Sequence, residues 1–230
     1  MTGVQTCALP ICLVGAVGHI ERYNPSLQEA RKRLDQLGTL YQVVTRRQGP
    51  FPARIADVGV VKDLATHDID LTAWVTGQKF TTVSAQTAHR SGREHEDMVA
   101  AVGKLENGII TNHLVNWLTP FKERLTVVTG ERGSLVADTL TADLTFYANA
   151  SVDTQWDSVA AFRGVSEGDV IRYAFAKPEP LRVEHEAFRD AVLGIDGAKD
   201  RIVTMEQGLA TVAVASAMIE SAKSGTVIKL

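Results

Sequence analysis

The clearest hydrophobic pattern in the chain spans residues 57–77, DVGVVKDLATHDIDLTAWVTG. Read at the helical period from about Val61, the segment is apolar nearly all round, which predicts a largely buried helix. The exception is a stripe of three side chains, because Asp63, His67 and Asp70 share one face of such a helix. Charged groups on a buried helix must be paired, solvated or functional. The stripe is therefore the first candidate site.

Alternating apolar and polar positions predict strands around this helix. The Asn107-Gly108 pair is the strongest hairpin signal in the chain. Successive hairpins indicate antiparallel pairing, so we predict an α+β fold with a large open, mainly antiparallel sheet and helices on one face. The predicted strands are 13–20, 40–48, 80–89, 98–105, 109–118, 124–129, 134–138, 144–148 and the edge strand 226–230.

Capping residues predict three further helices. Asn24 is a candidate N-cap, followed by a proline at the first helical position. The last helix begins with a Thr-x-x-Gln capping pattern at Thr204. The polar stretch 149–167 is predicted to be a loop. The three helices are expected at 25–37, 181–193 and 204–224, each ending before a glycine.

Composition excludes several classes of function. A net charge of −3 and a pI near 6.1 give no electrostatic case for binding nucleic acid or an anionic membrane. Cys7 and Cys12 suggest neither a disulfide framework nor a metal site. The apolar run 8–17 is too short to span a bilayer and lacks a basic flank. We therefore expect a soluble cytoplasmic protein.

The stripe has the side chains for acid/base chemistry. Histidine gives and takes protons near neutral pH, and a carboxylate one turn earlier can fix its tautomer and raise its basicity. Asp63 and His67 are thus candidate catalytic residues, with His67 as general acid/base. The alternative is a buried histidine satisfied by a neighbouring aspartate. Asp70 is read as structural, with a role beside His67 as its alternative.

Four further residues are candidates for substrate binding. Arg47 and Arg54 flank a loop just before the helix, and arginine forks suit a diphosphate. Arg22 and Asn24, in the run RYNP, are candidates for positioning sugar or cofactor. The alternatives are a surface ion pair for Arg22 and helix capping for Asn24. The scattered histidines of the strands, including His113, give no metal-ligand spacing, so no metal is assigned.

The runs GVVKDLATHDIDLTAWVTG and VGHIERYNPSL resemble the C-terminal half of the Gfo/Idh/MocA oxidoreductases, from about Leu13 to Leu230. The stretch RRQGPFPARIADVGVVKDLATHDID is similar to the branch of UDP-N-acetylglucosamine 3-dehydrogenases. The resemblance implies an NAD(P)-dependent enzyme acting on a sugar or polyol, and it implies that Asp63 and His67 are catalytic. Independently of the resemblance, a broad sheet with one uncovered face is a natural dimer surface, so we expect homo-oligomers formed through the open sheet face.

Two family features are missing from the sequence. No Gly-x-Gly-x-x-Gly follows a predicted strand, and the Glu-Lys-Pro motif is absent, so no residue is assigned to NAD or NADP. Residues 1–12 resemble translated sequencing-adapter DNA, so we expect a foreign leader and a lost N-terminal half. We expect 13–24 to be a remnant of the dinucleotide-binding domain and 25–230 to be the substrate-binding and oligomerisation domain.

Three hypotheses follow. The first is a fragment of an NAD(P)-dependent dehydrogenase of sugars or nucleotide sugars, inactive alone because a nicotinamide site needs the glycine-rich turn. The second is a non-catalytic sugar-binding or dimer-assembly module of the same fold. The third is a hydrolase with a metal held by the stripe of Asp63, His67 and Asp70, which lacks a second histidine.

Overall fold

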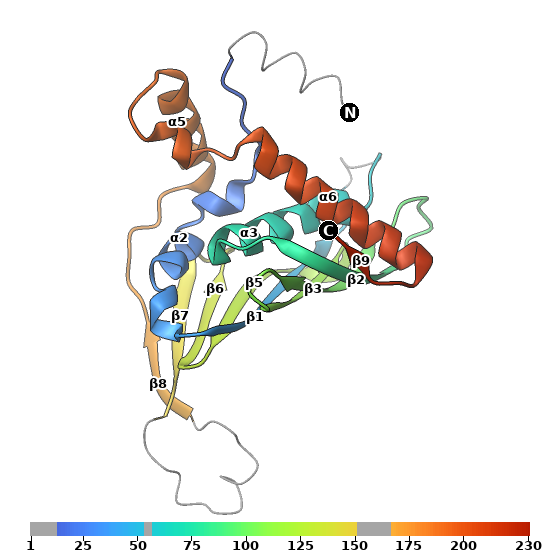
Figure 1. Ribbon diagram of the computed structural model, residues 1–230, viewed down its shortest axis with the longest axis horizontal. Coiled ribbons are helices and arrows are strands. Elements are labelled where there is room, and N and C mark those ends of the chain that lie inside the picture. Colours follow the sequence, from blue (N-terminus) through green and yellow to red (C-terminus); the bar gives the residue numbers. More distant parts are fainter. Residues whose placement is uncertain (1–12, 53–56, 151–166) are drawn as a thin grey trace, which may run out of the picture.

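The computed structural model describes residues 13–52, 57–150 and 167–230, which fold around one nine-stranded sheet of order β8-β7-β6-β5-β1-β4-β3-β2-β9 (Figure 1). Helices α2, α3 and α6 lie on one face of this sheet, so the predicted α+β architecture is confirmed. The strands are β1 (Leu40–Pro50), β2 (Phe80–Ala88), β3 (Met98–Leu105), β4 (Ile110–Asn116), β5 (Leu118–Gly130), β6 (Gly133–Asp138), β7 (Asp143–Asn149), β8 (Glu167–Arg172) and β9 (Ile228–Lys229).

Strand β1 lies in the middle of the sheet. Its pairing with β4 is the one parallel pairing among the described strands. It pairs in parallel with β4 and antiparallel with β5, and the other neighbouring strands pair antiparallel. The chain between β1 and β4 contains α3, which crosses the covered face of the sheet. The predicted hairpin joins β3 to β4, where Gly108 N donates to Leu105 O at 3.0 Å.

The first and last of the predicted helices begin at their predicted caps, and the helix expected at 181–193 begins at Pro180 after the cap Glu179. The first helix is shorter than expected. It ends at Lys32, and a separate 3-10 turn at 34–37 places Leu37 in the core. Arg33 leaves the helical region between them, with φ −112° and ψ 9°. The elements are η1 (Ile20–Tyr23), α2 (Pro25–Lys32), η2 (Leu34–Leu37), η3 (Val61–Ala65), α3 (Thr66–Thr76), α5 (Pro180–Val192), η4 (Ala198–Arg201) and α6 (Met205–Ser224).

The strand expected at 13–20 is not found, and this expectation was wrong. Residues 13–19 form no regular element, and Ile20 already belongs to the 3-10 turn η1. The segment makes one hydrogen bond to the chain ahead of α6, from Val17 N to Val203 O at 3.0 Å. A strand needs a ladder of such bonds to a neighbour, and the described part of the chain offers it none here.

The expected loop at 149–167 and the expected C-terminal edge strand can be compared with the structure, whereas some other expected segments cannot. The loop predicted at 149–167 ends in a strand that the sequence reading missed, because Glu167 opens β8 and pairs with Asn149. Residues 151–166 lie outside the described part of the chain, as do the expected leader 1–12 and Arg54. The edge strand predicted near the C-terminus is confirmed, since β9 pairs with β2.

The core lies between the sheet and the helices. Helix α6 packs on β2 with Val214 and Met218 buried, and α3 contributes Ile69 and Leu71. By length and composition alone the segment Ala198–Ser224 is apolar enough to cross a membrane. Part of the segment, including Val214 and Met218, is buried in this packing, and a core helix passes the same test.

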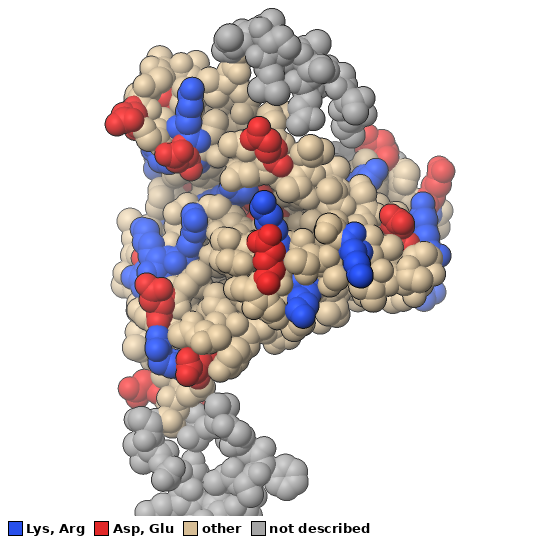
Figure 2. Space-filling view, in the orientation of Figure 1, with Lys and Arg blue, Asp and Glu red and all other residues tan. Residues whose placement is uncertain are grey.

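The opposite face of the sheet carries no helix (Figure 1). Exposed apolar side chains lie on it, with Val102 at 46% and Ile110 at 41% exposed, and Val44 and Val127 are part-buried beside them. Lysines, arginines and acidic residues are interspersed over the side shown in Figure 2, where no patch of one sign dominates. The uncovered sheet face is therefore an apolar surface that no described element covers.

Candidate active site

The helix that carries the stripe begins at a tight contact with the loop before β3. Glu96 O accepts from Val60 N at 2.9 Å, and its carboxylate accepts from Val61 N at 3.1 Å. A side chain at Gly59 would place a Cβ 2.0 Å from the Glu96 carboxylate, so this carboxylate would have to leave its position. Glu96 thus satisfies donors at the start of the helix and fixes where it begins.

The first turn of this helix is wider than a regular α-helix. Residues Val61–Ala65 form the π-turn η3, in which Thr66 N donates to Val61 O, and α3 begins at Thr66. Single π-turns inside helices are frequent at functional sites. Asp63 lies in the π-turn, while His67 and Asp70 lie in α3. The predicted stripe is therefore present, with its first member displaced by the wider turn.

Asp70 is paired with Arg22 in the core. Arg22 Nε donates to Asp70 Oδ2 at 2.8 Å and Nη2 donates to Oδ1 at 2.6 Å, with 1% of the aspartate side chain exposed. Arg22 Nη1 donates to Gln207 Oε1 at 2.9 Å, and Gln207 also caps α6 through Thr204 N. A two-bonded fork of this kind is geometrically specific. It ties η1, α3 and α6 together, so Arg22 is not in the surface ion pair considered as its alternative.

His67 faces a second histidine that the sequence reading did not single out. The rings of His19 and His67 pack edge to face, with centroids 5.9 Å apart and an interplanar angle of 83°. His19 Nε2 lies 3.9 Å from Asp70 Oδ1. Both ring nitrogens of His19 and Nδ1 of His67 are buried and make no hydrogen bond to a described residue. Unsatisfied buried groups of this kind require an explanation, and a catalytic site is one.

Arg47 is held in a second buried ion-pair group close to His67 in the structure. Its Nε donates to Asp68 Oδ1 at 2.6 Å, and its Nη1 donates to Glu21 Oε1 at 2.7 Å. Burial opposes the charged form, but Asp68 and Glu21 outweigh it and hold the pKa of Arg47 above its usual range. Arg47 therefore lies in β1 as a buried, ion-paired cation.

The environment of His67 lowers its proton affinity. Burial, and after it the positive charge of Arg47, lower the pKa of His67 to about 4, and only Glu21 among the main contributors raises it. The rise in basicity expected from a neighbouring carboxylate is thus outweighed. His67 is neutral at pH 7, which leaves an imidazole nitrogen able to accept a proton.

The predicted substrate-binding residues lie in different places in the structure. Arg22 and Arg47 both lie beside the His67 centre, but their guanidinium groups are engaged with Asp70, Asp68 and Glu21. Asn24 caps α2, where its Oδ1 accepts from Ser26 N at 3.1 Å and its Nδ2 donates to Thr139 O at 3.0 Å. Arg54 lies outside the described residues.

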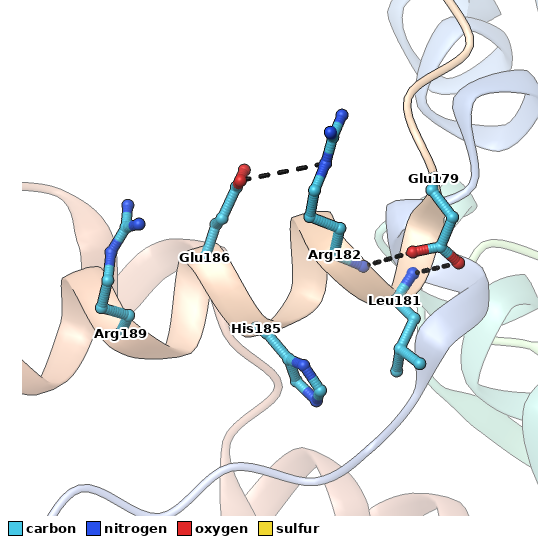
Figure 3. A pocket seen from close by; sticks show the side chains of 6 residues that line it. All are labelled: Glu179, Leu181, Arg182, His185, Glu186 and Arg189. Atoms are coloured by element: carbon cyan, nitrogen blue, oxygen red, sulfur yellow. Dashed lines mark hydrogen bonds and ion pairs between the residues drawn. The ribbon is translucent and has the colours of Figure 1, made fainter.

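Two hollows occur on the described surface. One, of 440 Å³, is a dent over the exposed side of α5, where Glu179 accepts from Leu181 N and Arg182 N (Figure 3). The other, of 480 Å³, lies between α3 and α6. His67 lines neither hollow. The acid/base candidate is therefore assigned from buried polar geometry, not from the shape of the surface.

Neither a metal-ligand cluster nor a phosphate-binding turn occurs among the described residues around this centre. The described part of the chain holds no group of three histidine, cysteine or carboxylate side chains placed to bind a metal ion. Gly15 and Gly18 lie in an irregular segment that leads into the 3-10 turn η1, so they form no phosphate-binding turn before a helix. The described residues do not fit the phosphates of a dinucleotide.

The fold and this centre define the class of protein. Residues 27–136 match the family model described as the GFO/IDH/MocA C-terminal domain. This stretch of the chain is therefore similar to the C-terminal domain of that family, as the resemblance noted in the sequence predicted.

Two curated relatives match part of the chain. UDP-N-acetylglucosamine 3-dehydrogenase of Acidithiobacillus ferrooxidans is 35% identical over 100 residues, covering 44% of this chain and 31% of the relative. Inositol 2-dehydrogenase 2 of Saccharopolyspora erythraea is 29% identical over 102 residues, covering 42% and 30%. The matched part of the chain thus spans about a third of the length of these curated relatives.

Solved structures share the fold over most of the chain. A structure of UDP-N-acetylglucosamine 3-dehydrogenase from A. ferrooxidans has a TM-score of 0.76 at 24% identity, covering 96% of this chain and 65% of that one. Levoglucosan dehydrogenase, solved in complex with NADH, has a TM-score of 0.72 at 16% identity, covering 94% and 66%. These relatives are dehydrogenases by name, and the solved structures share the fold of this chain.

Proposed function

We propose that the chain forms the substrate side of an NAD(P)-dependent dehydrogenase that oxidises a hydroxyl of a sugar or nucleotide sugar. The observation that carries the proposal is the buried, neutral His67, packed against His19 beside two ion-paired arginines. Removing a hydride from a carbinol carbon requires a group that accepts the hydroxyl proton, and a neutral imidazole is such a group.

In this proposal each residue has a distinct task. His67 accepts the hydroxyl proton, and Asp63, one turn earlier, orients the imidazole. Arg47 and Arg22 hold the surrounding carboxylates in place, and Arg54 and Asn24 remain candidates for substrate contact. Glu21 favours the protonated form of His67, so it stabilises the imidazolium as the proton arrives.

A bound nicotinamide would supply the hydride acceptor. Because the described residues lack a phosphate-binding turn, we propose that a separate dinucleotide-binding domain holds NAD or NADP and that residues 25–230 alone are inactive. The solved relatives extend beyond the matched region by about a third of their length, which leaves room for such a domain. We also propose a cytoplasmic location.

The test joins the chain to the N-terminal part of the A. ferrooxidans relative and follows reduced-cofactor formation with UDP-sugars and inositols. We expect turnover by the fusion, none by the chain alone, and a loss of about 100- to 10,000-fold in His67→Gln. His185→Gln, on the outer helix α5, serves as the matched control and should keep full activity. A folded fusion without turnover on any substrate would contradict the dehydrogenase function.

The open sheet face favours a second role, either alongside catalysis or in its place. Exposed Val102 and Ile110, with part-buried Val127 between neighbouring strands, form a surface that a second copy of the chain would cover. We propose that the chain forms homo-oligomers through this face. Sedimentation velocity should show dimers that Val102→Lys dissociates, whereas Val212→Lys, on the exposed side of α6, leaves them intact. Dimers in both variants would exclude this face.

A further inference from the structure

His19 is the second buried histidine of the active centre, and its backbone is fixed by the turn that leads into η1. His19 N donates to Val17 O at 2.9 Å, and Arg22 N donates to His19 O at 3.2 Å. Only 8% of the His19 side chain is exposed, and neither ring nitrogen is hydrogen-bonded to a described residue. Burying an imidazole costs free energy unless its nitrogens gain a partner. The position of His19 therefore points to a partner that forms during function.

One nitrogen of His67 is in the same condition. Nδ1 of His67 is buried and makes no hydrogen bond to a described residue, Asp63 included. The other nitrogen, Nε2, is not enclosed in this way, so it is the nitrogen that a substrate hydroxyl can reach. A neutral imidazole has one protonated and one bare nitrogen. Nε2 of His67 can therefore accept a proton only in the tautomer that carries its hydrogen on Nδ1.

Asp70 determines which nitrogen of His19 carries the hydrogen. Nε2 of His19 lies 3.9 Å from Asp70 Oδ1. Asp70 is ion-paired with Arg22, so it is present as a carboxylate, which accepts hydrogen bonds and cannot donate them. A bare Nε2 would turn its lone pair toward this negative oxygen. The tautomer of His19 with its hydrogen on Nε2 is therefore favoured, and Nδ1 is left as an acceptor.

The two rings are close enough for a small rotation to join their unbonded nitrogens. Their centroids are 5.9 Å apart, and their planes are nearly perpendicular, at 83°. Histidine rings rotate about χ2 at little cost. Catalytic hydrogen bonds in a resting site are often long and tighten when substrate binds. A hydrogen bond from Nδ1 of His67 to Nδ1 of His19 would satisfy both buried nitrogens.

Both histidines are available for this bond in their neutral form. Burial is the main cause that lowers the pKa of each below the usual 6.5, to about 4 for His67. At His19 the charge of Asp70 opposes the shift and that of Arg22 adds to it. At neutral pH each ring thus has one donor and one acceptor.

We propose that His19 is a positioning residue that sets the tautomer of His67. Nδ1 of His19 accepts the hydrogen bond from Nδ1 of His67, and Nε2 of His19 donates to Asp70. Nε2 of His67 is then bare, and it takes the substrate hydroxyl proton as the oxygen–hydrogen bond breaks. The catalytic part of this inference rests on the proposed dehydrogenase function, whereas the tautomer is a property of the folded chain.

The first measurement is nitrogen NMR of the full chain with labelled histidine at neutral pH, in which the spectrum of His67→Gln assigns the His67 signals. We expect His67 to carry its hydrogen on Nδ1 about fivefold in preference to Nε2, the ratio that one ordinary hydrogen bond gives. His19→Phe keeps a ring and removes the acceptor, so it should abolish the preference. His19→Asn places an amide oxygen near the Nδ1 position and should restore it. His185→Phe, on the exposed side of α5, is the matched control and should change nothing.

The second measurement is turnover by the fusion with the N-terminal part of the A. ferrooxidans relative. His19→Phe should lower kcat about fivefold and leave KM unchanged, because fewer molecules have a bare Nε2 on His67, and His19→Asn should recover the loss. A merely structural defect would not be recovered by the smaller asparagine. Circular dichroism checks that each variant is folded.

Two results would overturn the inference. The first is a His67 that carries its hydrogen mainly on Nε2 in the unaltered chain, and this result needs no variant to fold. The second is a preference for Nδ1 that persists in folded His19→Phe. A folded fusion without turnover, whose chain shows the expected tautomers, would instead reject the dehydrogenase function and keep the assignment of His19.

Discussion

Helices α3 and α5 carry the same kinds of side chain in opposite surroundings. In α3, Asp70 pairs with Arg22 at 2.6 Å, and the two side chains are 1% and 11% exposed. In α5, Arg182 pairs with Glu186 at 3.9 Å, and those side chains are 66% and 50% exposed. The first pair joins residues 48 positions apart, and the second spans one turn of its own helix.

The contrast shows which charges fix the geometry of the site. A buried pair must keep its partner, because a lone ion in the core costs several kcal/mol of desolvation, whereas an exposed pair exchanges its partner for water. His67 belongs to the first kind of surrounding, and burial lowers its pKa to about 4. The polar groups around α3 are therefore held at set distances, as a reaction centre requires, and those of α5 are free to move.

The largest expected effect is on the buried pair. Asp70→Asn should lower the free energy of unfolding by about 3 to 5 kcal/mol, because it leaves the Arg22 guanidinium buried without a counter-charge. Urea unfolding followed by circular dichroism measures the change. The double variant Arg22→Met with Asp70→Leu should recover most of the loss. If it does not, the fork has a geometric role beyond charge balance.

The second largest effect is expected from acid pH, which should lower the free energy of unfolding through His113 on the covered face of the sheet. Burial lowers the pKa of His113, which is fully buried and bonded to Thr45 Oγ1 at 2.8 Å, to about 4. Below the usual pKa of about 6.5 the unfolded chain takes up a proton that the folded chain refuses. Stability is therefore complete above pH 6.5 and falls by about 3 kcal/mol as the pH drops toward 4.

Urea unfolding at a series of pH values tests this expectation. The drop in the free energy of unfolding between neutral and acid pH should be smaller in His113→Gln, whatever the absolute stability of that variant. An equal drop in both proteins would assign the acid sensitivity to other groups, His67 among them, whose pKa is lowered in the same sense.

Sequence patterns were sufficient where structure is local. Strand β3 has the predicted bounds, and α6 begins at the predicted capping box of Thr204 and Gln207. The strand expected at 13–20 failed because an apolar run becomes a strand only beside a partner, and its neighbour is an irregular segment. The parallel pairing of β1 with β4 was also missed, since no local signal marks a crossover.

In the candidate site, too, the local arrangement was predictable from the sequence and the distant contacts were not. The helical period placed His67 and Asp70 on one face, and His19 does meet both. The identity of their partners was not readable, because Arg22 reaches Asp70 across 48 residues and Arg47 reaches Asp68 across 21. His19 stands in the same HIERYNP run as Arg22, so its position in that motif was the available signal.

The caps of α2 and α5 offer the same contrast between buried and exposed groups, with a smaller expected effect on the free energy of unfolding. Asn24 is a buried cap of α2 that also bonds to Thr139 O, and Glu179 is an exposed cap of α5. We expect Asn24→Ala to cost about 1 to 2 kcal/mol and Glu179→Ala about 0.5 kcal/mol. Thermal unfolding of the two variants measures the difference. Equal losses would show that burial adds nothing to the cap.

The smallest effect is expected at the exposed pair of α5. Arg182→Gln should change the free energy of unfolding by less than about 0.5 kcal/mol, because water replaces Glu186 as the partner and salt already screens the pair. Urea unfolding at low and high salt checks both statements. A loss of more than about 1 kcal/mol at micromolar protein concentration would mean that α5 is covered in solution by another surface, and the contrast with α3 would then apply only to the isolated chain.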